Sequence, residues 1–185
     1  LTNNNLTGPI PVELTQSLVL MRLLLHHNYL EGPIPPELGE LTSMQYLDLS
    51  YNQLTGSIPP ELGNLTKLSV SLNLSFNKLT GSIPPELGNL TNLKYFLNLS
   101  GNKLTGAIPA QLGNLALLQR LYLDHTKLTG SIPLSFVKLT SLFLFHFSDT
   151  HLCEPTTTAF LEWKASVDDW ETTGDICTIK GNKKP

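Results

Sequence analysis

The chain has 185 residues, of which 15% are charged, and its formal net charge is −3. With only 12 Lys and Arg residues, it has no broad basic surface for nucleic acid or anionic lipid, so the sequence predicts no nucleic-acid partner. Its apolar runs are too short for a transmembrane helix, so it predicts no membrane span in this chain. Leucine contributes 39 residues, all at or before Leu161, and this bias calls for an explanation.

The chain begins inside a repeating pattern. Leu1 already occupies a strand position of its repeat, and no cysteine-containing cap precedes it. A repeat stack without a cap exposes its core, so we expect that upstream sequence has been lost or that a partner covers this end. Self-association through the N-terminal end is the alternative.

The same frame returns every 24 or 25 residues. One polar residue marks each copy, and the series reads Asn4, Asn28, Asn52, Asn77, Asn102, Thr126 and Thr150. The Leu-x-Leu alternation before each of these residues predicts a short strand with one buried face. Repetition stacks such strands in parallel about 4.8 Å apart, and the leucines then fill continuous buried columns.

Each marker residue follows a strand, where the chain turns inward and leaves backbone groups away from water. An Asn amide has donors and an acceptor for such groups. We therefore predict a structural ladder of Asn28, Asn52, Asn77 and Asn102 that bonds the backbone of neighbouring coils. Thr126 and Thr150 have only a hydroxyl, so the ladder should be weaker there.

Six Gly-x-Ile-Pro segments follow the marker residues, and they start at Gly8, Gly32, Gly56, Gly81, Gly106 and Gly130. Gly permits a sharp bend, and Pro is tolerated where no strand donor is needed. The stretches that come next predict one short helical turn each, ended by Gly39, Gly63, Gly88 or Gly113. The 25-residue intervals predict a bulge or longer loop near Val70 and near Phe96.

These motifs resemble the plant-type extracellular leucine-rich repeat family, whose repeat reads LxxLxxLxLxxNxLxGxIPxxLGxL, over residues 1–152. Such repeats occur in receptor-kinase ectodomains, in polygalacturonase-inhibiting proteins and, more sporadically, in secreted proteins of algae and bacteria. The resemblance implies an α/β repeat solenoid of about seven repeats, the first truncated. It implies a right-handed superhelix with a concave parallel β-sheet, a second small sheet from the Gly-x-Ile-Pro segments and short 3-10 or helical turns on the convex side. It also implies binding rather than catalysis.

Residues 153–177 differ in composition and are predicted to form a C-terminal helical cap. Phe160, Trp163, Val167 and Trp170 have the spacing of one helix face, with Pro155 in the first turn. This aromatic face should close the core behind Phe145 and Phe147. Residues 178–185 are short and basic, and we expect a flexible tail there.

Cys153 and Cys177 bracket the predicted cap and are the only cysteines. Two cysteines alone cannot complete a four-ligand zinc site, and their placement suggests a disulfide and an oxidising compartment. The alternative is a pair of free buried thiols in a cytosolic protein. Plant caps of this family usually place the two cysteines closer together, which leaves an algal or bacterial source open.

The side chains between the strand leucines are predicted to face solvent on the concave side. Arginine and aromatic residues are enriched at protein interfaces, and Asn, Asp and Tyr suit sugar hydroxyls. For any single residue the alternative is ordinary solvation. The candidate binding residues are Arg22, His26, Tyr46, Asp48, Tyr51, Asn73, Phe76, Asn98, Arg120, Tyr122, Asp124, His125, His146 and Asp149.

Catalysis is not expected, although His125, His146, Ser148 and Asp149 cluster in the last two coils. His125 and Asp149 should be lateral neighbours about 5 Å apart, but a flat open sheet has no pocket and no oxyanion donors. Neighbouring strand residues such as His26 and His27 should point apart, so no metal site and no cofactor are expected.

Asn5, Asn64, Asn73, Asn89 and Asn98 begin N-glycosylation sequons, although the repeat consensus itself generates such triplets. Glycans on Asn64 and Asn89 would project from the convex side, and Asn5 is a further possible site. Glycans on Asn73 and Asn98 would block the concave centre.

The sequence therefore predicts a non-catalytic, extracellular or cell-surface recognition module that binds a protein, peptide or glycan through its concave face. One alternative is a structural protein that stacks end to end or in a matrix. Another, by family analogy alone, is an inhibitor of a cell-wall-degrading glycosidase.

Overall fold

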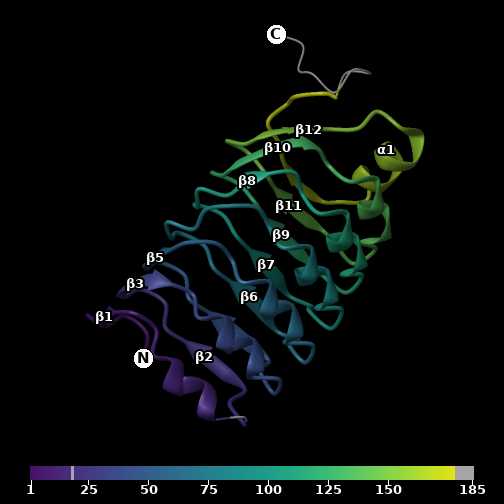
Figure 1. Ribbon diagram of the computed structural model, residues 1–185. Coiled ribbons are helices and arrows are strands. Elements are labelled where there is room, and N and C mark those ends of the chain that lie inside the picture. The colour runs from purple at the N-terminus through teal and green to yellow at the C-terminus, as the bar shows by residue number, and fades with distance from the viewer. Residues whose placement is uncertain (18, 178–185) are drawn as a thin grey trace.

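The computed structural model describes residues 1–17 and 19–177. The chain forms a curved solenoid of stacked coils (Figure 1). Each complete coil contributes a strand to a main sheet, crosses to a second face and returns through a short helical turn. The tail predicted for residues 178–185 lies outside the described residues.

The main sheet has seven parallel strands within the described residues, in the order β13-β11-β9-β7-β6-β4-β2. Equal frame positions lie opposite one another, so that Tyr46 pairs with Arg22 on one side and with Ser71 on the other. The strands are β2 (Arg22–Leu24), β4 (Tyr46–Asp48), β6 (Ser71–Asn73), β7 (Phe96–Asn98), β9 (Arg120–Tyr122), β11 (Leu144–His146) and β13 (Asp169–Glu171).

The Gly-x-Ile-Pro side carries two three-stranded sheets in the described chain, β1-β3-β5 and β12-β10-β8, where one small sheet was expected. Between these two sheets the β pairing of the described residues is reduced to one isolated parallel bridge, from Ser57 to Thr80. Backbone bonds nevertheless continue across the gap, since Lys78 N donates to Leu54 O at 2.8 Å. The strands are β1 (Thr7–Gly8), β3 (Tyr29–Pro33), β5 (Gln53–Thr55), β8 (Thr105–Gly106), β10 (Lys127–Ser131) and β12 (His151–Cys153).

Six 3-10 helices of five residues each line the convex side of the described chain. They are η1 (Val12–Gln16), η2 (Pro36–Glu40), η3 (Pro60–Asn64), η4 (Pro85–Asn89), η5 (Ala110–Asn114) and η6 (Leu134–Lys138).

The expectation that a glycine ends these turns is wrong by one residue. Gly39, Gly63, Gly88 and Gly113 lie inside their helices, each followed by one more helical residue. A Cβ atom on Gly63 would lie 2.4 Å from the carbonyl oxygen of Glu86 in the next coil. These glycines therefore allow consecutive coils to pack backbone against backbone, rather than terminating the helix.

The two longer coils absorb their extra residue just before a strand, as predicted. Val70 and Tyr95 each form a bend directly before β6 and β7. Val70 N donates to Gln45 O at 2.9 Å, and Tyr95 N donates to Val70 O at 3.0 Å, so the ladder continues through both bends. The strand register is unchanged, with Phe96 opposite Ser71.

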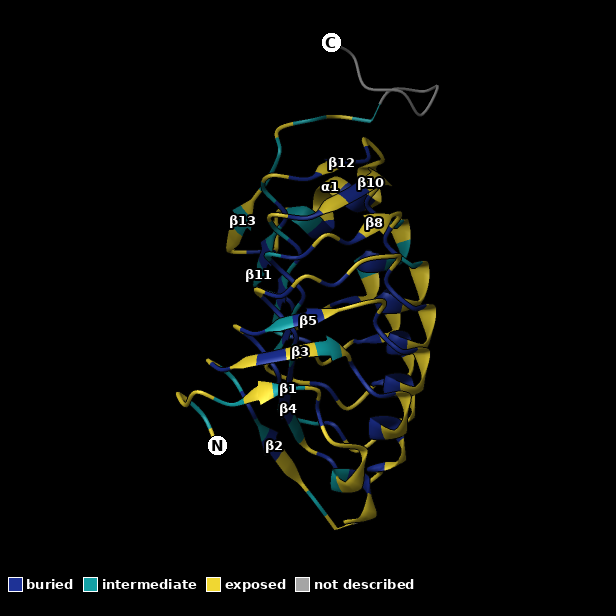
Figure 2. Cartoon of the chain, turned by 60° about the vertical axis from the view of Figure 1, so that its left-hand side comes forward, coloured by how far each residue is buried: buried dark blue, intermediate teal, exposed yellow. Residues whose placement is uncertain are grey.

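Leucine columns fill the interior, which Figure 2 shows as buried along the whole stack. Leu47, Leu72 and Leu97 from successive strands have no exposed surface. At about 25 cal/mol per Å², burial of such columns is the main stabilising contribution. No helix within residues 1–17 or 19–177 has the length and apolar character needed to cross a bilayer.

The predicted cap helix is shorter than its aromatic spacing suggested. Helix α1 spans Thr158–Lys164 and begins after Thr157, whose hydroxyl accepts from Phe160 N at 3.4 Å. Pro155 precedes the helix, and Val167 and Trp170 follow it, so the prediction of one continuous helix is wrong.

Trp170 lies instead in β13, which pairs with β11 and covers the last edge of the main sheet. Asp169 N donates to Phe143 O, and Phe147 N donates to Glu171 O, both at 2.9 Å. A strand satisfies these backbone groups and a helix could not, which explains why the chain extends here.

The cap nevertheless closes the core where expected. The Trp170 ring lies 5.3 Å from Phe145, 5.4 Å from Phe147 and 5.7 Å from Trp163, measured between ring centroids. A disulfide joins Cys153 to Cys177.

Glu154 is a buried carboxylate inside the cap. It accepts hydrogen bonds from Lys164, Thr172 and Trp170. Burial alone would raise the pKa of Glu154, but these hydrogen bonds and the Lys164 charge outweigh burial and lower it below its ordinary value.

Candidate functional site

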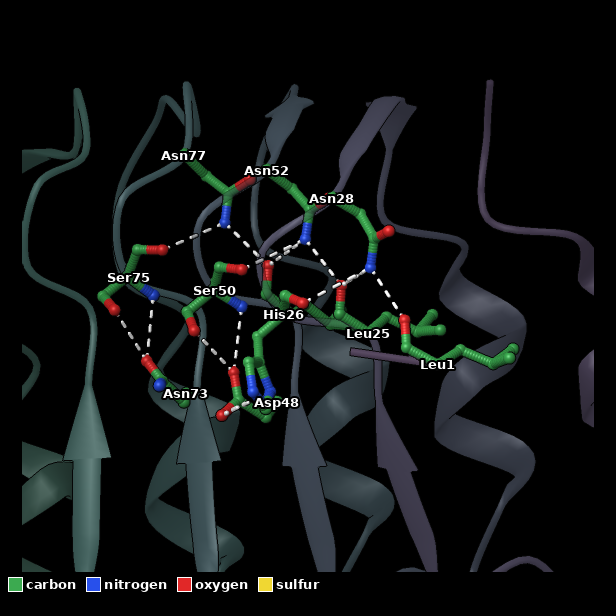
Figure 3. A network of polar contacts seen from close by, with 11 residues as sticks. Leu1, Leu25, His26, Asn28, Asp48, Ser50, Asn52, Asn73, Ser75 and Asn77 are labelled. Atoms are coloured by element: carbon green, nitrogen blue, oxygen red, sulfur yellow. Dashed lines mark hydrogen bonds and ion pairs between the residues drawn. The ribbon is translucent and has the colours of Figure 1, made fainter. Parts of the chain in front are cut away.

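A ladder of Asn side chains lies at the end of the main-sheet strands (Figure 3). Asn52 Nδ2 donates to Leu25 O, Leu49 O and Ser50 O at 3.0 to 3.1 Å, and its Oδ1 accepts from Leu30 N at 3.0 Å. Asn28, Asn77 and Asn102 make equivalent bonds to their own coil and to the coil before. One amide therefore ties two coils together.

The two Thr residues that replace Asn bond only within their own coil. Thr126 donates to Leu123 O at 2.7 Å, and Thr150 donates to Phe147 O and accepts from Leu152 N. The amide ladder between coils therefore ends at Asn102.

Polar side chains in the centre of the concave face are paired with one another. Asp48 Oδ1 accepts from Ser50 N at 3.0 Å and from Ser50 Oγ at 2.6 Å. The pairs Asn73 with Ser75 and Asn98 with Ser100 repeat this arrangement. Asp48 and the three serines are buried, contrary to the expectation of solvent exposure, because each pair closes on itself between neighbouring strands.

The N-terminal strands hold Arg22 over the ring of Tyr46, with the guanidinium carbon 5.5 Å from the ring centroid. His26 Nδ1 lies 3.4 Å from Asp48 Oδ2, an ion-pair distance without hydrogen-bond geometry. Burial and the nearby Asp48 charge raise the pKa of Tyr46. His26 Nδ1 and the neighbouring Ser71 Oγ are buried without a hydrogen-bond partner among the described residues.

The C-terminal strands present a different group of half-exposed side chains, Arg120, Tyr122 and Asp124. Arg120 lies over the ring of Phe143, with its guanidinium carbon 5.0 Å from the ring centroid. Burial is the largest cause of the raised pKa of Asp124, and its own backbone hydrogen bond and the nearby His125 offset part of the effect. Burial also raises the pKa of Tyr122.

Both ring nitrogens of His146 face carboxylates from the cap strand. Nε2 lies 3.0 Å from Asp169 Oδ1, and Nδ1 lies 3.1 Å from Glu171 Oε2. Ser148 also donates to Glu171, at 2.9 Å. Asp169 and Glu171 were missed from sequence because their segment was assigned to a helix. The alternation of two acids around Trp170 was the strand signal.

His125 and Asp149 lie together as predicted, with His125 Nδ1 2.8 Å from Asp149 Oδ2. His26 faces Asp48 and His27 stacks on Tyr51. The two rings nevertheless meet in a T-shaped contact, 5.7 Å apart between centroids, so the prediction that they point apart is wrong, because both residues follow β2 and His27 has a left-handed backbone. Within residues 1–17 and 19–177 no three His, Cys, Asp or Glu side chains converge as metal ligands.

Tyr51 and Phe76 do not lie on the strand faces where the sequence placed them. Each follows its strand in a left-handed turn, with φ of 52° and 51°. Their rings stack along the edge of the solenoid, 4.5 Å apart between centroids. The left-handed backbone turns these side chains away from the sheet.

The sequon residues fall in two settings. Asn5, Asn64 and Asn89 are exposed, and Asn64 and Asn89 end the convex helices η3 and η4. Asn73 and Asn98 lie half-buried on the concave face, with Oδ1 engaged by serines.

With this geometry established, comparison with known proteins is informative. A model of the Leucine Rich Repeat matches residues 19–41, 43–65, 70–90, 95–115 and 117–139. The chain belongs to the leucine-rich repeat family. No curated protein matches the sequence.

Solved leucine-rich repeat structures agree. A TDR receptor is 35% identical over 95% of this chain and 29% of its own, with a TM-score of 0.86. The ectodomain of the receptor kinase GASSHO1/SCHENGEN3 from Arabidopsis thaliana is 36% identical over 86% of this chain and 19% of its own, with a TM-score of 0.79. A plant ice-binding protein is 38% identical over 86% of this chain and 51% of its own, with a TM-score of 0.78.

This leucine-rich repeat chain therefore spans between about a fifth and a half of the length of these proteins. The matches confirm the plant-type repeat and the solenoid fold. Because the similar receptor ectodomains bind ligands, they also support the prediction that the chain is not an enzyme.

Proposed function

We propose that this leucine-rich repeat chain is an extracellular recognition module that binds its ligand through the C-terminal half of the concave face. The observation that carries the proposal is the half-exposed group Arg120, Tyr122 and Asp124 beside the carboxylates of β13. Polar side chains in the centre of the sheet hydrogen-bond to one another. The side chains that remain available to a ligand therefore lie at the C-terminal end.

The charges of this surface favour a protein or peptide ligand with a cationic group. Asp124, Asp169 and Glu171 outnumber the one permanent cation, Arg120. Charge complementarity accelerates association and makes it sensitive to salt. Among similar structures, GASSHO1/SCHENGEN3 holds CASPARIAN STRIP INTEGRITY FACTOR 2, and the plant peptide hormone receptor RGFR1 holds RGF2. A neutral glycan is the less favoured ligand because it would leave the negative charge of these carboxylates uncompensated.

Two features support an extracellular location. The bond between Cys153 and Cys177 is of a kind that persists in oxidising compartments. The similar plant structure of GASSHO1/SCHENGEN3 is a membrane-receptor ectodomain.

An array of synthetic peptides of graded charge, with neutral and acidic oligosaccharides on the same support, tests the proposal. We expect cationic peptides to bind the native chain, with an affinity that falls as the salt concentration increases. Tyr122→Ala and Asp124→Asn should each lower affinity by about tenfold or more. Asn98→Ala, at the frame position of Tyr122 but in the self-paired centre, is the control and should change little. Equal binding by all variants would refute the concave site.

A specific observation supports a second candidate function, binding to ice. Exposed Thr residues recur on the Gly-x-Ile-Pro side, with Thr80 paired opposite Ser57, and one similar structure is a plant ice-binding protein. The repeated hydroxyls are Thr55, Ser57, Thr80, Ser82, Thr105, Thr129 and Ser131. Inhibition of ice recrystallisation by the native chain, lost in Thr80→Lys with Thr105→Lys, would establish it. A native chain without this effect would exclude it.

A further inference from the structure

One position of the repeat has a left-handed backbone in every coil. It is the residue just before the ladder residue, and its φ lies between 51° and 63° in the series Asn3, His27, Tyr51, Phe76, Gly101, His125 and Asp149. Gly, Asn and Asp suit this conformation, whereas it is unfavourable for most other residues. Three consecutive coils nevertheless place a ring there, so the fold alone does not explain His27, Tyr51 and Phe76.

The three rings form a continuous stack, the aromatic stack. His27 and Tyr51 lie 4.2 Å apart with 11° between their planes, and Tyr51 and Phe76 lie 4.5 Å apart at 16°. Phe76 also covers Gly101, where an added Cβ would lie 2.7 Å from the Phe76 ring. The faces of Tyr51 are therefore occupied, yet Tyr51 and Phe76 remain 44% and 41% exposed. Their edges are what solvent or a ligand can reach.

The aromatic stack borders a groove of about 410 Å³ that also involves Asn4, Tyr29 and Gln53. None of its described lining residues is Lys, Arg, Asp or Glu. Asn4 uses Nδ2 to donate to Thr2 O, which leaves its Oδ1 as an acceptor. Gln53 uses Oε1 to accept from Lys78 Nζ, which leaves its Nε2 as a donor. The groove thus offers a free acceptor and a free donor beside an apolar wall.

This combination fits a peptide. An extended peptide presents a donor and an acceptor at each residue, so it can bond both Asn4 Oδ1 and Gln53 Nε2, which lie two coils apart. The edge of an aromatic ring is positively polarised and attracts the face of another ring in a T-shaped contact. A sugar would pack best against ring faces, and here those of Tyr51 are covered.

We propose that the groove beside the aromatic stack binds an extended, uncharged peptide segment that inserts an aromatic side chain against the edges of Tyr51 and Phe76. The site lies at the rim of the N-terminal coils, outside the C-terminal concave surface, and it does not depend on the function proposed for that surface. It selects a neutral segment, whereas the concave carboxylates select a cationic one.

Selection of phage-displayed random peptides on the immobilised native chain tests the site. The enriched peptides should share an uncharged segment with Phe, Tyr or Trp. Tyr51→Asn combined with Phe76→Gly gives each position a residue that its backbone favours, so the variant should fold, as circular dichroism would verify. We expect this variant to bind the selected peptides about thirtyfold more weakly, the scale of an interface hot spot.

Two controls isolate the groove. His125→Asn changes the same frame position two coils beyond Phe76, and it should leave peptide affinity unchanged. Asp124→Asn should also leave it unchanged, so that failure of this proposal and failure of the concave site are separable. Absence of enriched peptides, equal binding by the double variant, or stack-dependent binding of neutral oligosaccharides in place of peptides would each overturn the proposal.

Discussion

From Asn28 to Asn102 a buried amide bonds each coil to the coil before it, whereas Thr126 and Thr150 bond only within their own coils. The C-terminal coils rely instead on rings, as Phe145, Phe147 and the cap tryptophans pack at the end of the core. The same backbone geometry is thus stabilised by directional polar bonds in one region and by apolar burial in the other. Five changes test this division.

The largest effect is expected from Trp163→Ala in the cap. The Trp163 ring is 7% exposed, contacts Phe136, Phe160 and Trp170, and donates through Nε1 to Leu139 O. Removing a buried ring of this kind costs about 3–5 kcal/mol of unfolding free energy. Urea unfolding followed by circular dichroism measures it. Leu161→Ala on the exposed face of α1 is the control, and equal effects would contradict the account of the cap.

A smaller effect is expected in the ladder. Asn52→Ala removes four hydrogen bonds and leaves Leu30 N buried without a partner, whereas Leu25 O, Leu49 O and Ser50 O each keep another donor, at a cost of about 3 kcal/mol. Thr126→Ala removes one bond and should cost about 1 kcal/mol. The same unfolding measurement compares them. If the two variants were equally stable, the ladder would not distinguish the two regions.

Glu154 makes the stability of the cap sensitive to acid. Because its pKa in the folded chain is lowered, its stabilising contribution is present above its ordinary value of 4.5 and is lost as pH falls through the folded value. Urea midpoints should therefore fall between about pH 5 and pH 3. Glu154→Gln should flatten this part of the profile, and a native slope retained in that variant would contradict the assignment.

Asp124 should give the opposite slope on the concave face. Burial raises its pKa, so ionisation is less favourable in the folded chain, and its contribution to stability declines as pH rises from 3.8 through the folded value. The difference in urea midpoint between the native chain and Asp124→Asn measures this decline. A native midpoint that instead rises relative to that of Asp124→Asn as pH increases would show that the sign is wrong.

The smallest effect on stability is expected at the aromatic stack. Phe76→Asn loses a ring contact worth about 0.5–1.5 kcal/mol but relieves a left-handed backbone of similar cost. The free energy of unfolding, measured by thermal denaturation and evaluated at the midpoint, should therefore change by less than about 1 kcal/mol. A loss of more than about 2 kcal/mol would mean that the stack is structural.

The repeat fold could be predicted from sequence because each signal occurs many times. Leu47 and Leu49 look the same as Leu72 and Leu74, so one ambiguous strand is resolved by its neighbours. The cap occurs once. The distance from Phe160 to Trp170 fits a helix, while the acids around Trp170 fit a strand, and only the open edge of β11 decides between them.

The candidate surface was harder to predict for two physical reasons. Asp48 and Ser50 are two residues apart on one strand, and nothing in their spacing shows that they pair and become buried. The left-handed backbone of Tyr51 and Phe76 is also hidden, since neither residue type favours it. The sequence signals for it are Asn3, Gly101 and Asp149 at the same frame position, and the aromatic residues between them obscure the pattern.

The bends at Val70 and Tyr95 have a consequence for how such chains change over time. Each bend holds one additional residue without moving the strands that follow. The length of the chain just before each strand can therefore change without a change in strand register. Insertions before Ser71 or Phe96 can add new loops at the start of β6 or β7 while the strands of the main sheet keep their positions. The loops that precede the strands can therefore vary while the concave face is preserved.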